Sequence, residues 1–505
     1  MEWNVTTSLL CIGSQDFSAR VSSVIRTDVP GCVCHSATLG GAWSAYLSGR
    51  AEIVLIEIGL RHHASIQQGV RLLLKQIRER FETAPIIVLA LSAPERLGFG
   101  GDLLFEEAPS FGPSQFVDAM LAPAPGSLAL PALKEQLVDL ISHASEELKR
   151  RATGKTPLPP LGASGWVQSL ADPKSRSLWM RWLPRYASYT NENPVIIGDT
   201  GSGKTNLAYA LHLLSGRKGK FVSITPRDFS SSELVQAELF GAVPGAYTGA
   251  VEKWGLVRMA EGGTLFIDEL QSIDKELQGK LITFIENKIY RRVGASETVH
   301  ADVRFVFASN KSLEFMREQG VLREDFAYRL ERVILSLAPL RERPLDVASG
   351  LAFALAKIRR QRPESIVIEG FTPAAYRALL YHPWPGNLRQ LENTVARLCD
   401  YADLRKITLI DEVAVMEIVS DLNPFGAAPH EVVVRAAQEL SRRAITEKIA
   451  ESAPAIHVFQ DILRKKALET TGGDVTQAAQ ILGEHPTLLS LFAEEHVKSG
   501  EVWPK

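Results

Sequence analysis

Cysteine is scarce in this sequence, and long apolar segments are missing. The four cysteines are Cys11, Cys32, Cys34 and Cys399, and because their spacing matches no metal-binding pattern we expect reduced thiols. No apolar run reaches the roughly 18 residues of a membrane-spanning helix. The first residues include Glu2 and lack the basic segment of a signal peptide. These absences predict a cytoplasmic protein with no membrane partner.

An excess of charge of one sign is missing as well. The 56 basic and 58 acidic residues leave a formal net charge of −2. Without an overall basic surface, any contact with nucleic acid has to come from a local patch. The 505 residues, of which 45% are hydrophobic and 23% charged, have the composition of a globular protein. This length suffices for about three domains of roughly 150 residues each.

The first part of the chain predicts a parallel sheet. Its short apolar runs at residues 8–13, 52–58 and 85–91 are bounded by turn residues and separated by helical patterns. Such alternation is typical of a doubly wound α/β domain. A helical pattern at about residues 130–151 closes this domain, which we place at residues 1–152.

A second α/β unit follows a proline-rich linker at residues 156–164, whose prolines cannot sustain a helix. We place this unit at residues 161–402. Its predicted strands lie at residues 194–197, 220–224, 264–267 and 303–308. Ligands of such a doubly wound core bind at the carboxyl ends of the strands. From Phe371 the pattern indicates helices alone, which predicts a helical lid at about residues 343–402.

A glycine-rich loop between a predicted strand and a predicted helix has the pattern of a phosphate-binding loop. It consists of Gly198, Asp199, Thr200, Gly201, Ser202, Gly203, Lys204 and Thr205. The glycines let backbone N–H groups face a phosphate at the start of a helix. Lys204 would reach the β and γ phosphates, and the Thr205 hydroxyl would bind Mg²⁺. The loop therefore predicts a nucleoside triphosphate bound with Mg²⁺.

Two acids end the apolar strand at residues 264–267. Asp268 would complete the Mg²⁺ shell, and Glu269 would orient or deprotonate the attacking water. Such a pair alone can be a solvated strand end, but after a phosphate-binding loop it indicates a hydrolytic site. Arg323 and Arg329 lie about two helical turns apart, close to one face. They could bring positive charge to the γ phosphate, although a solvated helix also carries such arginines.

The central unit resembles the AAA+ ATPase domain of bacterial enhancer-binding proteins, which are ring-forming activators of the RNA polymerase carrying sigma-54. The resemblance covers about half of the chain and rests on the segments ELFGAVPGAYTGA, GGTLFIDELQSIDKELQGKLITFIE, LREDFAYRL, LAPLRERPLDV and WPGNLRQLEN. The hexapeptide GAYTGA is close to diagnostic of this family. The resemblance implies ATP hydrolysis with Mg²⁺ in a ring of identical subunits, which we expect to be a hexamer. It also implies sigma-54 RNA polymerase and enhancer DNA as partners.

The same resemblance implies roles for individual residues. The tip of a loop that contacts sigma-54 would consist of Gly245, Ala246, Tyr247, Thr248, Gly249 and Ala250. Tyr247 stands where the family usually has Phe, and Thr248 is the family's main contacting threonine. The residues that would sense the γ phosphate, within one subunit or from its neighbour, are Asn310, Arg323, Arg329 and Arg389.

One position departs from the family. Thr225, in the segment SITPRD, stands where the family usually has an Asn that couples to the catalytic Glu. Hydrolysis can therefore be slower or differently gated. Arg227 and Asp228 are also unusual, and the sequence assigns them no role. Two alternatives stay open, namely an AAA+ remodeller of another protein and a nucleotide-binding regulator with little ATPase activity.

The N-terminal domain resembles a response-regulator receiver that has lost its chemistry. A receiver needs an acidic pair after its first strand, where this chain has Gly13, Ser14 and Gln15. Its third strand presents Glu57 where the family has the phosphorylated Asp. We therefore predict a receiver-shaped module that is not phosphorylated and that responds to a regulatory protein or ligand.

The C-terminal part predicts a small all-α domain at residues 430–498, after a second linker at residues 423–429. Residues 472–492 resemble a helix-turn-helix of the factor-for-inversion-stimulation type. The candidate DNA contacts are Thr476, Gln477, His485, Thr487 and Ser490. The predicted second helix has no Lys or Arg, although such helices usually bring cations to phosphates. Nonspecific contacts could come from Arg442, Arg443, Arg464, Lys465 and Lys466, and a helical docking unit is the alternative.

Overall fold

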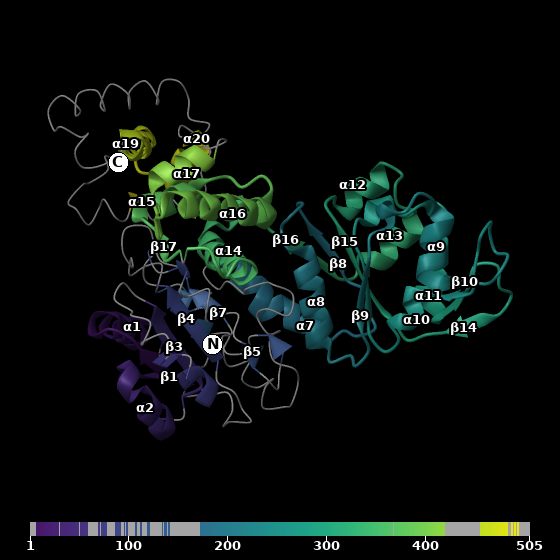
Figure 1. The fold of residues 1–505 in the computed structure, drawn as a ribbon, viewed down its shortest axis with the longest axis horizontal. Helices are drawn as coiled ribbons and strands as arrows, with labels where there is room; N and C mark the ends of the chain where they lie inside the picture. Colours follow the sequence, from purple (N-terminus) through teal and green to yellow (C-terminus); the bar gives the residue numbers. More distant parts are fainter. Residues whose placement is uncertain are drawn as a thin grey trace.

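The computed structural model describes residues 7–29, 31–49, 51–58, 172–366, 368–419 and 455–482, with shorter stretches within 69–141 and 486–493. An N-terminal α/β unit, a central α/β core with a lid, and C-terminal helices follow one another along the chain (Figure 1). Within these described residues, no helix is long and apolar enough to cross a membrane.

The N-terminal unit is built on a five-stranded parallel sheet with the order β2-β1-β3-β4-β7. The strands are β1 (Thr7–Ile12), β2 (Cys32–Ala37), β3 (Ile53–Ile58), β4 (Ile86–Leu91) and β7 (Ala119–Leu121), and the first helices are α1 (Gln15–Asp28) and α2 (Ala42–Gly49). Successive residues of a strand face opposite sides of the sheet. Leu9 and Cys11 accordingly pack with α1, whereas Leu10 and Ile12 belong to the core on the other side.

The central core has a second five-stranded parallel sheet, ordered β16-β8-β15-β12-β9. Its strands are β8 (Val195–Gly198), β9 (Phe221–Ile224), β12 (Thr264–Ile267), β15 (Arg304–Ser309) and β16 (Ile334–Leu337). Four of these strands match the predicted ones, and the edge strand β16 was not predicted. Leu265 and Phe305 pack on one face of the sheet, while Phe266 and Val306 pack on the other. Burial on both faces explains why these strands read as short continuous apolar runs.

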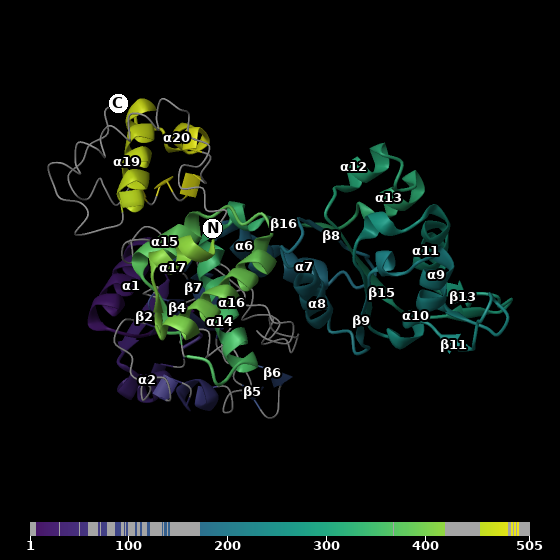
Figure 2. The same cartoon turned by 45° about the horizontal axis from the view of Figure 1, so that its top comes forward.

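Helices cover this sheet and two hairpins extend from it. The helices are α6 (Pro173–Arg176), α7 (Leu183–Ala187), α8 (Lys204–Ser215), α9 (Ser232–Phe240), α10 (Leu256–Met259), α11 (Lys275–Asn287), α12 (Leu313–Glu318) and α13 (Glu324–Leu330), with a π-helical turn at Ser177–Trp182 between α6 and α7. The hairpins pair β10 (Gly241–Ala242) with β11 (Lys253–Trp254) and β13 (Ile289–Arg291) with β14 (Thr298–His300). Both hairpins lie at the end of the core farthest from the N-terminal unit (Figures 1 and 2).

The lid contains α14 (Val347–Gln361), α15 (Pro373–Tyr381), α16 (Asn387–Arg405) and α17 (Glu412–Ile418). The prediction that the lid is wholly helical from Phe371 is wrong, because β17 (Gly370–Phe371) and β18 (Leu409–Ile410) form a short parallel pair. One apolar core joins the lid to the N-terminal sheet, and it includes Val54, Leu74, Leu355 and Leu379. The lid therefore packs directly against the N-terminal unit (Figure 2).

At the C-terminal end, α19 (Ala455–Thr470) packs against α20 (Val475–Leu482) around Leu468, Ala478 and Ala479. Beyond α20 the described residues include short helical stretches at 486–487, 489–490 and 492–493. A complete helix-turn-helix therefore stays a prediction. The predicted linkers at residues 156–164 and 423–429 lie outside the described residues, and the domain boundaries also stay predictions. The α/β class with parallel sheets is confirmed.

Candidate nucleotide-binding site

The glycine-rich loop connects β8 to α8 in a conformation that needs glycine. Gly201 and Gly203 have φ angles of 77° and 105°, in the left-handed region. Lys204 opens α8, and its Nζ donates to the carbonyl oxygens of Gly198 at 3.0 Å and Asp199 at 3.3 Å. Burial lowers the pKa of Lys204, while nearby carboxylates oppose that change. The loop thus holds a buried ammonium group where a helix begins.

The acidic pair follows β12 at the same edge of the sheet. The Asp268 N–H donates to the carbonyl oxygen of Ile224, at the end of the neighbouring strand β9, at 3.0 Å. Glu269 adopts a left-handed conformation with φ of 57°, which is uncommon for a residue other than glycine. Its N–H donates to Asp268 Oδ1 at 2.9 Å. This sharp turn directs the two carboxylates away from the sheet, toward the glycine-rich loop.

A cavity of about 410 Å³ joins the loop to the acidic pair. The predicted site residues in its wall are Thr200, Gly201, Gly203, Lys204, Thr205, Asp268, Glu269 and Arg389. Gly198, Asp199 and Ser202 are not in the wall, and Ser202 is fully buried. The structure therefore brings the phosphate-loop lysine, both acids and the lid arginine to one cavity.

The lid reaches this cavity through direct contacts with the loop. Asn387 Nδ2 donates to the carbonyl oxygen of Thr200 at 3.0 Å, and the Leu388 N–H donates to that of Gly201 at 3.1 Å. A Cβ on Gly201 would lie 2.4 Å from the carbonyl oxygen of Gly386. Only glycine at position 201 allows this close approach, which places Arg389 beside the cavity.

Asn310 is linked to Glu269 by a residue that the sequence did not indicate. Gln271 Nε2 donates to Glu269 Oε2 at 2.5 Å and to Asn310 Oδ1 at 3.2 Å. The Ser309 hydroxyl donates to Gln271 Oε1 at 2.9 Å. Gln271 lies in the short turn Leu270–Ser272 after Glu269. Its position two residues beyond a candidate catalytic acid is the one feature of the sequence that could have indicated this contact.

A second unpredicted neighbour of Glu269 is Arg227. Its Nη1 lies 3.5 Å from Glu269 Oε2, and the arginine also lines the cavity. Arg227 belongs to the short turn Pro226–Asp228 that directly follows β9 and Thr225. The sequence marked this arginine as unusual without giving it a role.

Arg323 and Arg329 do not line the cavity of their own chain. Arg323 is the N-cap residue of α13 and pairs with Asp325 at 2.6 Å, and Arg329, inside the helix, pairs with Glu286. The expectation that both lie on one helical face is wrong, because Arg323 precedes the helix. Both side chains are about 40% exposed, which leaves them accessible to another subunit.

Two oxygen donors in the cavity fit a magnesium ion. The Thr205 hydroxyl and the Asp268 carboxylate line the same wall, and Mg²⁺ prefers oxygen ligands completed by water and phosphate. Across the part of the chain that the structure describes, no group of three or more His, Cys, Asp or Glu side chains could hold a metal. A nucleotide-bound Mg²⁺ does not need such a group, because it takes only one or two protein carboxylates.

The hexapeptide forms the connection between β10 and β11. Gly245 and Gly249 have φ angles of 82° and 83° and open space around them, so backbone conformation alone favours glycine there. The Ala250 N–H donates to the Tyr247 carbonyl oxygen at 2.9 Å, which closes a turn at the tip. Thr248 is exposed at this turn, whereas Tyr247 is partly buried.

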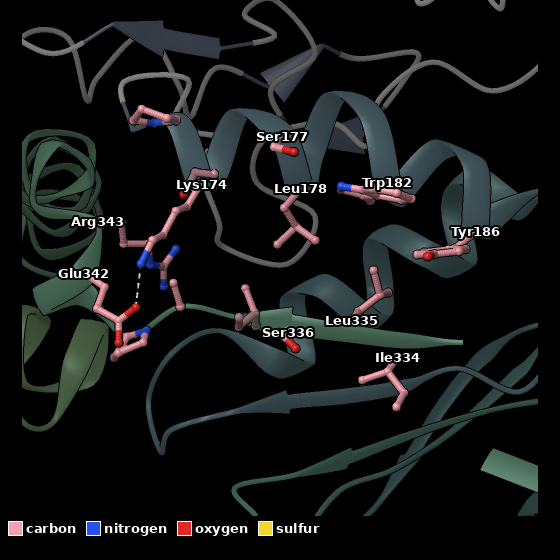
Figure 3. Close-up of a pocket in the computed structure, with 15 residues that line it drawn as sticks. Lys174, Ser177, Leu178, Trp182, Tyr186, Ile334, Leu335, Ser336, Glu342 and Arg343 are labelled. Atoms are coloured by element: carbon pink, nitrogen blue, oxygen red, sulfur yellow. Dashed lines mark hydrogen bonds and ion pairs between the residues drawn. The ribbon is translucent and has the colours of Figure 1, made fainter. Parts of the chain in front are cut away.

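A larger cavity of about 780 Å³ lies between the α6–α7 segment and the edge strand β16 (Figure 3). The Lys174–Glu342 ion pair, at 2.6 Å, closes one end of it, and Trp182 and Tyr186 line the other (Figure 3). It shares no lining residue with the phosphate-loop cavity. Arg343 in its wall donates to the carbonyl oxygen of Ser202 at 2.8 Å and so supports the loop from behind.

The predicted DNA contacts divide into three groups. Thr476 and Gln477 are exposed on α20, Thr487 and Ser490 are half-buried, and His485 lies outside the described residues. The expectation that Arg464 could contact phosphates is wrong, because this arginine is 2% exposed.

Comparison with known proteins identifies the central unit. Residues 179–336 match the sigma-54 interaction domain family, and residues 341–413 match an AAA+ ATPase lid domain. The chain is 38% identical over 289 residues to the alginate biosynthesis transcriptional regulatory protein AlgB of Pseudomonas aeruginosa, covering 56% of this chain and 60% of AlgB. It is 35% identical to the Nif-specific regulatory protein of Azotobacter vinelandii, covering 59% of this chain and 52% of that protein.

The DNA-binding transcriptional regulator NtrC of Rhizobium meliloti is 32% identical over 369 residues, covering 69% of this chain and 72% of NtrC. A solved structure of NtrX from Brucella abortus in complex with ADP aligns over 98% of this chain and 99% of that one, at 22% identity and a TM-score of 0.46. The family matches and the shared length with NtrC show that the chain belongs to the family of sigma-54-dependent transcriptional regulators with an AAA+ ATPase fold.

Proposed function

We propose that this protein hydrolyses ATP in a homo-oligomeric ring, expected to be a hexamer, to convert closed promoter complexes of sigma-54 RNA polymerase into open ones. The observation that carries the proposal is the GAYTGA loop, with Thr248 exposed at its tip, attached to a core that also carries the phosphate-loop cavity. Family membership supports the partner, and the cavity supports ATP with Mg²⁺. The chain spans only about half to three-fifths of the first relatives' length, so the activity of the whole protein is proposed here.

The predicted site residues that line the cavity have roles in this reaction. The loop N–H groups and Lys204 would bind the phosphates, and Thr205 and Asp268 would hold Mg²⁺, which neutralises charge on the phosphates. Glu269 would orient the attacking water and accept its proton. Arg389 would contact the nucleotide from the lid, which is fixed against the loop by Asn387.

The covalent path from the cavity to the tip is short. Thr225 and Arg227 line the cavity, and α9 follows within a few residues and leads directly into β10 and the hexapeptide. Backbone bonds from Val243 N to the Val293 carbonyl oxygen at 3.1 Å, and from Val293 N to that of Gly241 at 2.8 Å, tie the loop to the neighbouring hairpin. A displacement at the end of β9 would therefore move both hairpins.

Between subunits, Arg323 and Arg329 would reach the neighbour's γ phosphate, and Asn310 would respond to it within the subunit. Their present partners Asp325 and Glu286 are exposed, so exchanging them for a phosphate costs little.

The C-terminal helices would bind enhancer DNA, and the N-terminal unit would receive a regulatory protein or ligand. The N-terminal unit packs against the lid, which supports the idea that a ligand bound to this unit would act directly on the ATPase ring.

Replacing the tip threonine tests the proposal. We expect Thr248→Ala to hydrolyse ATP at the wild-type rate but to lose open-complex formation, because only the contact with sigma-54 is removed. Binding of sigma-54 trapped by ADP with a metal fluoride should be lost in parallel. Thr298→Ala, a change of another exposed threonine on the adjacent hairpin, is the matched control and should keep both activities. Full open-complex formation by Thr248→Ala would contradict the assignment of the loop.

A further inference from the structure

The carboxylate of Glu269 is contacted by two side chains at the same oxygen. Gln271 Nε2 donates to Oε2 at 2.5 Å, and Arg227 Nη1 lies 3.5 Å from it. Glu269 is 12% exposed at its side chain, so its charge is largely shielded from water. A nearly buried carboxylate gains more from a nearby cation than an exposed one, because solvent screening is weaker.

The position of Arg227 follows from the chain itself. β9 ends at Ile224, directly beside Ile267 at the end of β12, so the residues after the two strands are neighbours. Pro226 then begins the short turn that contains Arg227, and its fixed φ restricts how this turn can move.

We propose that Arg227 is a positioning residue that restrains Glu269, with Gln271 as the second contact, and thereby slows ATP hydrolysis in the resting subunit. The inference rests on the proposed ATPase function and adds to it a residue that restrains the proposed catalytic acid. Arg227 and Glu269 both line the phosphate cavity, so a bound triphosphate would occupy the space beside the pair and separate the carboxylate from the guanidinium. Glu269 would then be released for the attacking water when the triphosphate is in place.

The restraint is expected to be weak. Arg227 is 62% exposed at its side chain, and ion pairs with an exposed partner contribute little. A weak pair biases the orientation of Glu269 without locking it, which suits a contact that nucleotide has to break. Its removal should therefore change the rate by a small factor and leave the machinery that binds ATP intact.

The test is steady-state ATP hydrolysis by the full chain carrying Arg227→Ala. We expect kcat to rise about two- to fivefold, the range that an exposed ion pair supports, with an unchanged KM for ATP. Arg227→Lys retains a cation at the position and should stay close to the wild-type rate. Arg332→Ala is the matched control, because Arg332 is 71% exposed and pairs with Glu192 at 3.1 Å, outside the cavity wall.

The salt dependence of kcat separates the proposed restraint from a purely structural role of Arg227, which would not depend on salt. Between about 0.05 M and about 0.5 M KCl, the ratio of variant to wild-type kcat should fall toward one, because salt screens the pair in the wild type. Melting of the nucleotide-free protein gives a second readout. The shifts in Tm of Arg227→Ala and Glu269→Gln should be non-additive in the double variant, because the two side chains interact.

The outcomes separate the restraint from the underlying function. Absence of Glu269-dependent hydrolysis by the wild-type protein would remove the proposed function itself. With wild-type hydrolysis present, an unchanged or lowered kcat in Arg227→Ala would overturn the restraint alone. A raised KM would overturn it too, since Arg227 would then be a ligand of the phosphates, and so would additive Tm shifts.

Discussion

The central sheet and the N-terminal sheet share one architecture and differ in what stands at their strand ends. Both are five-stranded and parallel, and each carries a glutamate toward the carboxyl end of an inner strand, Glu269 after β12 and Glu57 in β3. Glu269 faces a cavity of about 410 Å³ with Lys204 in its wall. Glu57 instead accepts the Ser14 N–H at 2.7 Å. Two parallel sheets of different strand order thus place one glutamate at a cavity and bind the other to the backbone at the start of a helix.

The difference arises in the segment that follows the first strand of each unit. After β8, a loop with two glycines in the left-handed region leaves room for phosphate. After β1, Gly13 lies so close to Glu57 that an added Cβ would be 2.8 Å from its Cβ and its Oε2. The glutamate fills the space above the N-terminal strand ends, and α1 begins there with Ser14 as its N-cap.

The largest expected effect comes from the same isosteric change at both glutamates. Glu269→Gln should lower kcat for ATP hydrolysis by at least about 100-fold, the usual contribution of a general base, while ATP binding stays intact. Glu57→Gln should leave kcat and KM unchanged, because Glu57 does not line the phosphate-loop cavity. Steady-state hydrolysis together with equilibrium nucleotide binding measures both variants. A strong loss of hydrolysis in Glu57→Gln would show that the two sheets are chemically coupled and would break the comparison.

A smaller effect is expected from the glycine on which the lid rests. Gly201→Ala should destabilise the protein by about 2–4 kcal/mol, because the new Cβ combines a left-handed φ with a clash against the rigid backbone of Gly386. Urea unfolding measures the loss, and ATP binding should fall in parallel because the loop and the lid separate.

Two other glycines are matched controls for this substitution. Gly216 has a similar φ of 70°, but no atom lies within 4 Å of an added Cβ. Gly216→Ala should therefore lower the free energy of unfolding by only about 1 kcal/mol. Gly13→Ala would meet Glu57 Cβ at 2.8 Å, a clash that only a backbone shift relieves, and should leave ATP binding unchanged because Gly13 does not line the phosphate-loop cavity. Equal losses of ATP binding in Gly201→Ala and Gly13→Ala would contradict the special role of the lid contact.

The strands at the centre of each sheet were predictable, as was the edge strand β9, whereas the edge strands β2, β7 and β16 were not. The apolar runs that became β8, β12 and β15 are buried on both faces and carry a strong signal. Edge strands β2 and β16 alternate between buried or half-buried and exposed residues, and β16 is only four residues long. The pair β17–β18 joins two-residue strands far apart in sequence. Pairing of such short strands is decided by tertiary packing, which periodicity does not reveal.

In the candidate site too, some residues could be predicted from the sequence and others could not. The phosphate-loop residues and the acidic pair are contiguous in sequence, so their pattern indicates their chemistry directly. The contacts of Arg227 and Gln271 with Glu269 depend on which strands are neighbours and on the direction of two short turns. Neither dependence is written in a local pattern, so the two contacts could not be predicted, although Gln271 follows Glu269 by only two residues.

The two units should also differ in how their stability depends on pH. Burial lowers the pKa of His212 in α8 from 6.5 to about 4, and its Nδ1 lies 2.9 Å from Thr264 Oγ1 in β12. As pH falls from about 6.5 to about 4, the unfolded chain binds a proton that folded His212 does not, so stability decreases. The loss should be on the order of 2 kcal/mol after allowance for screening.

His212→Gln should abolish this part of the acid sensitivity, measured as Tm against pH. Cys11 holds a buried position in the N-terminal sheet, where burial raises the pKa of its thiol to about 12. It does not titrate in this range, so Cys11→Ala should shift Tm by the same amount at pH 5 and pH 7. An unchanged pH profile in His212→Gln would place the acid sensitivity elsewhere.

The smallest expected effect concerns helix caps, where the two units should behave alike. The Ser14 hydroxyl accepts the Phe17 N–H at 3.2 Å at the start of α1, and Asp274 Oδ1 accepts the Leu277 N–H at 2.7 Å at the start of α11. Ser14→Ala and Asp274→Ala should each cost about 1 kcal/mol in urea unfolding, because each leaves one helix N–H without its partner. Neither change touches the Ser14 N–H that holds Glu57, nor the cavity around Glu269, so kcat should stay at the wild-type value. A loss of hydrolysis in Asp274→Ala alone would mean that α11 positions the catalytic strand end, and the two units would then differ in their scaffolds as well as in their chemistry.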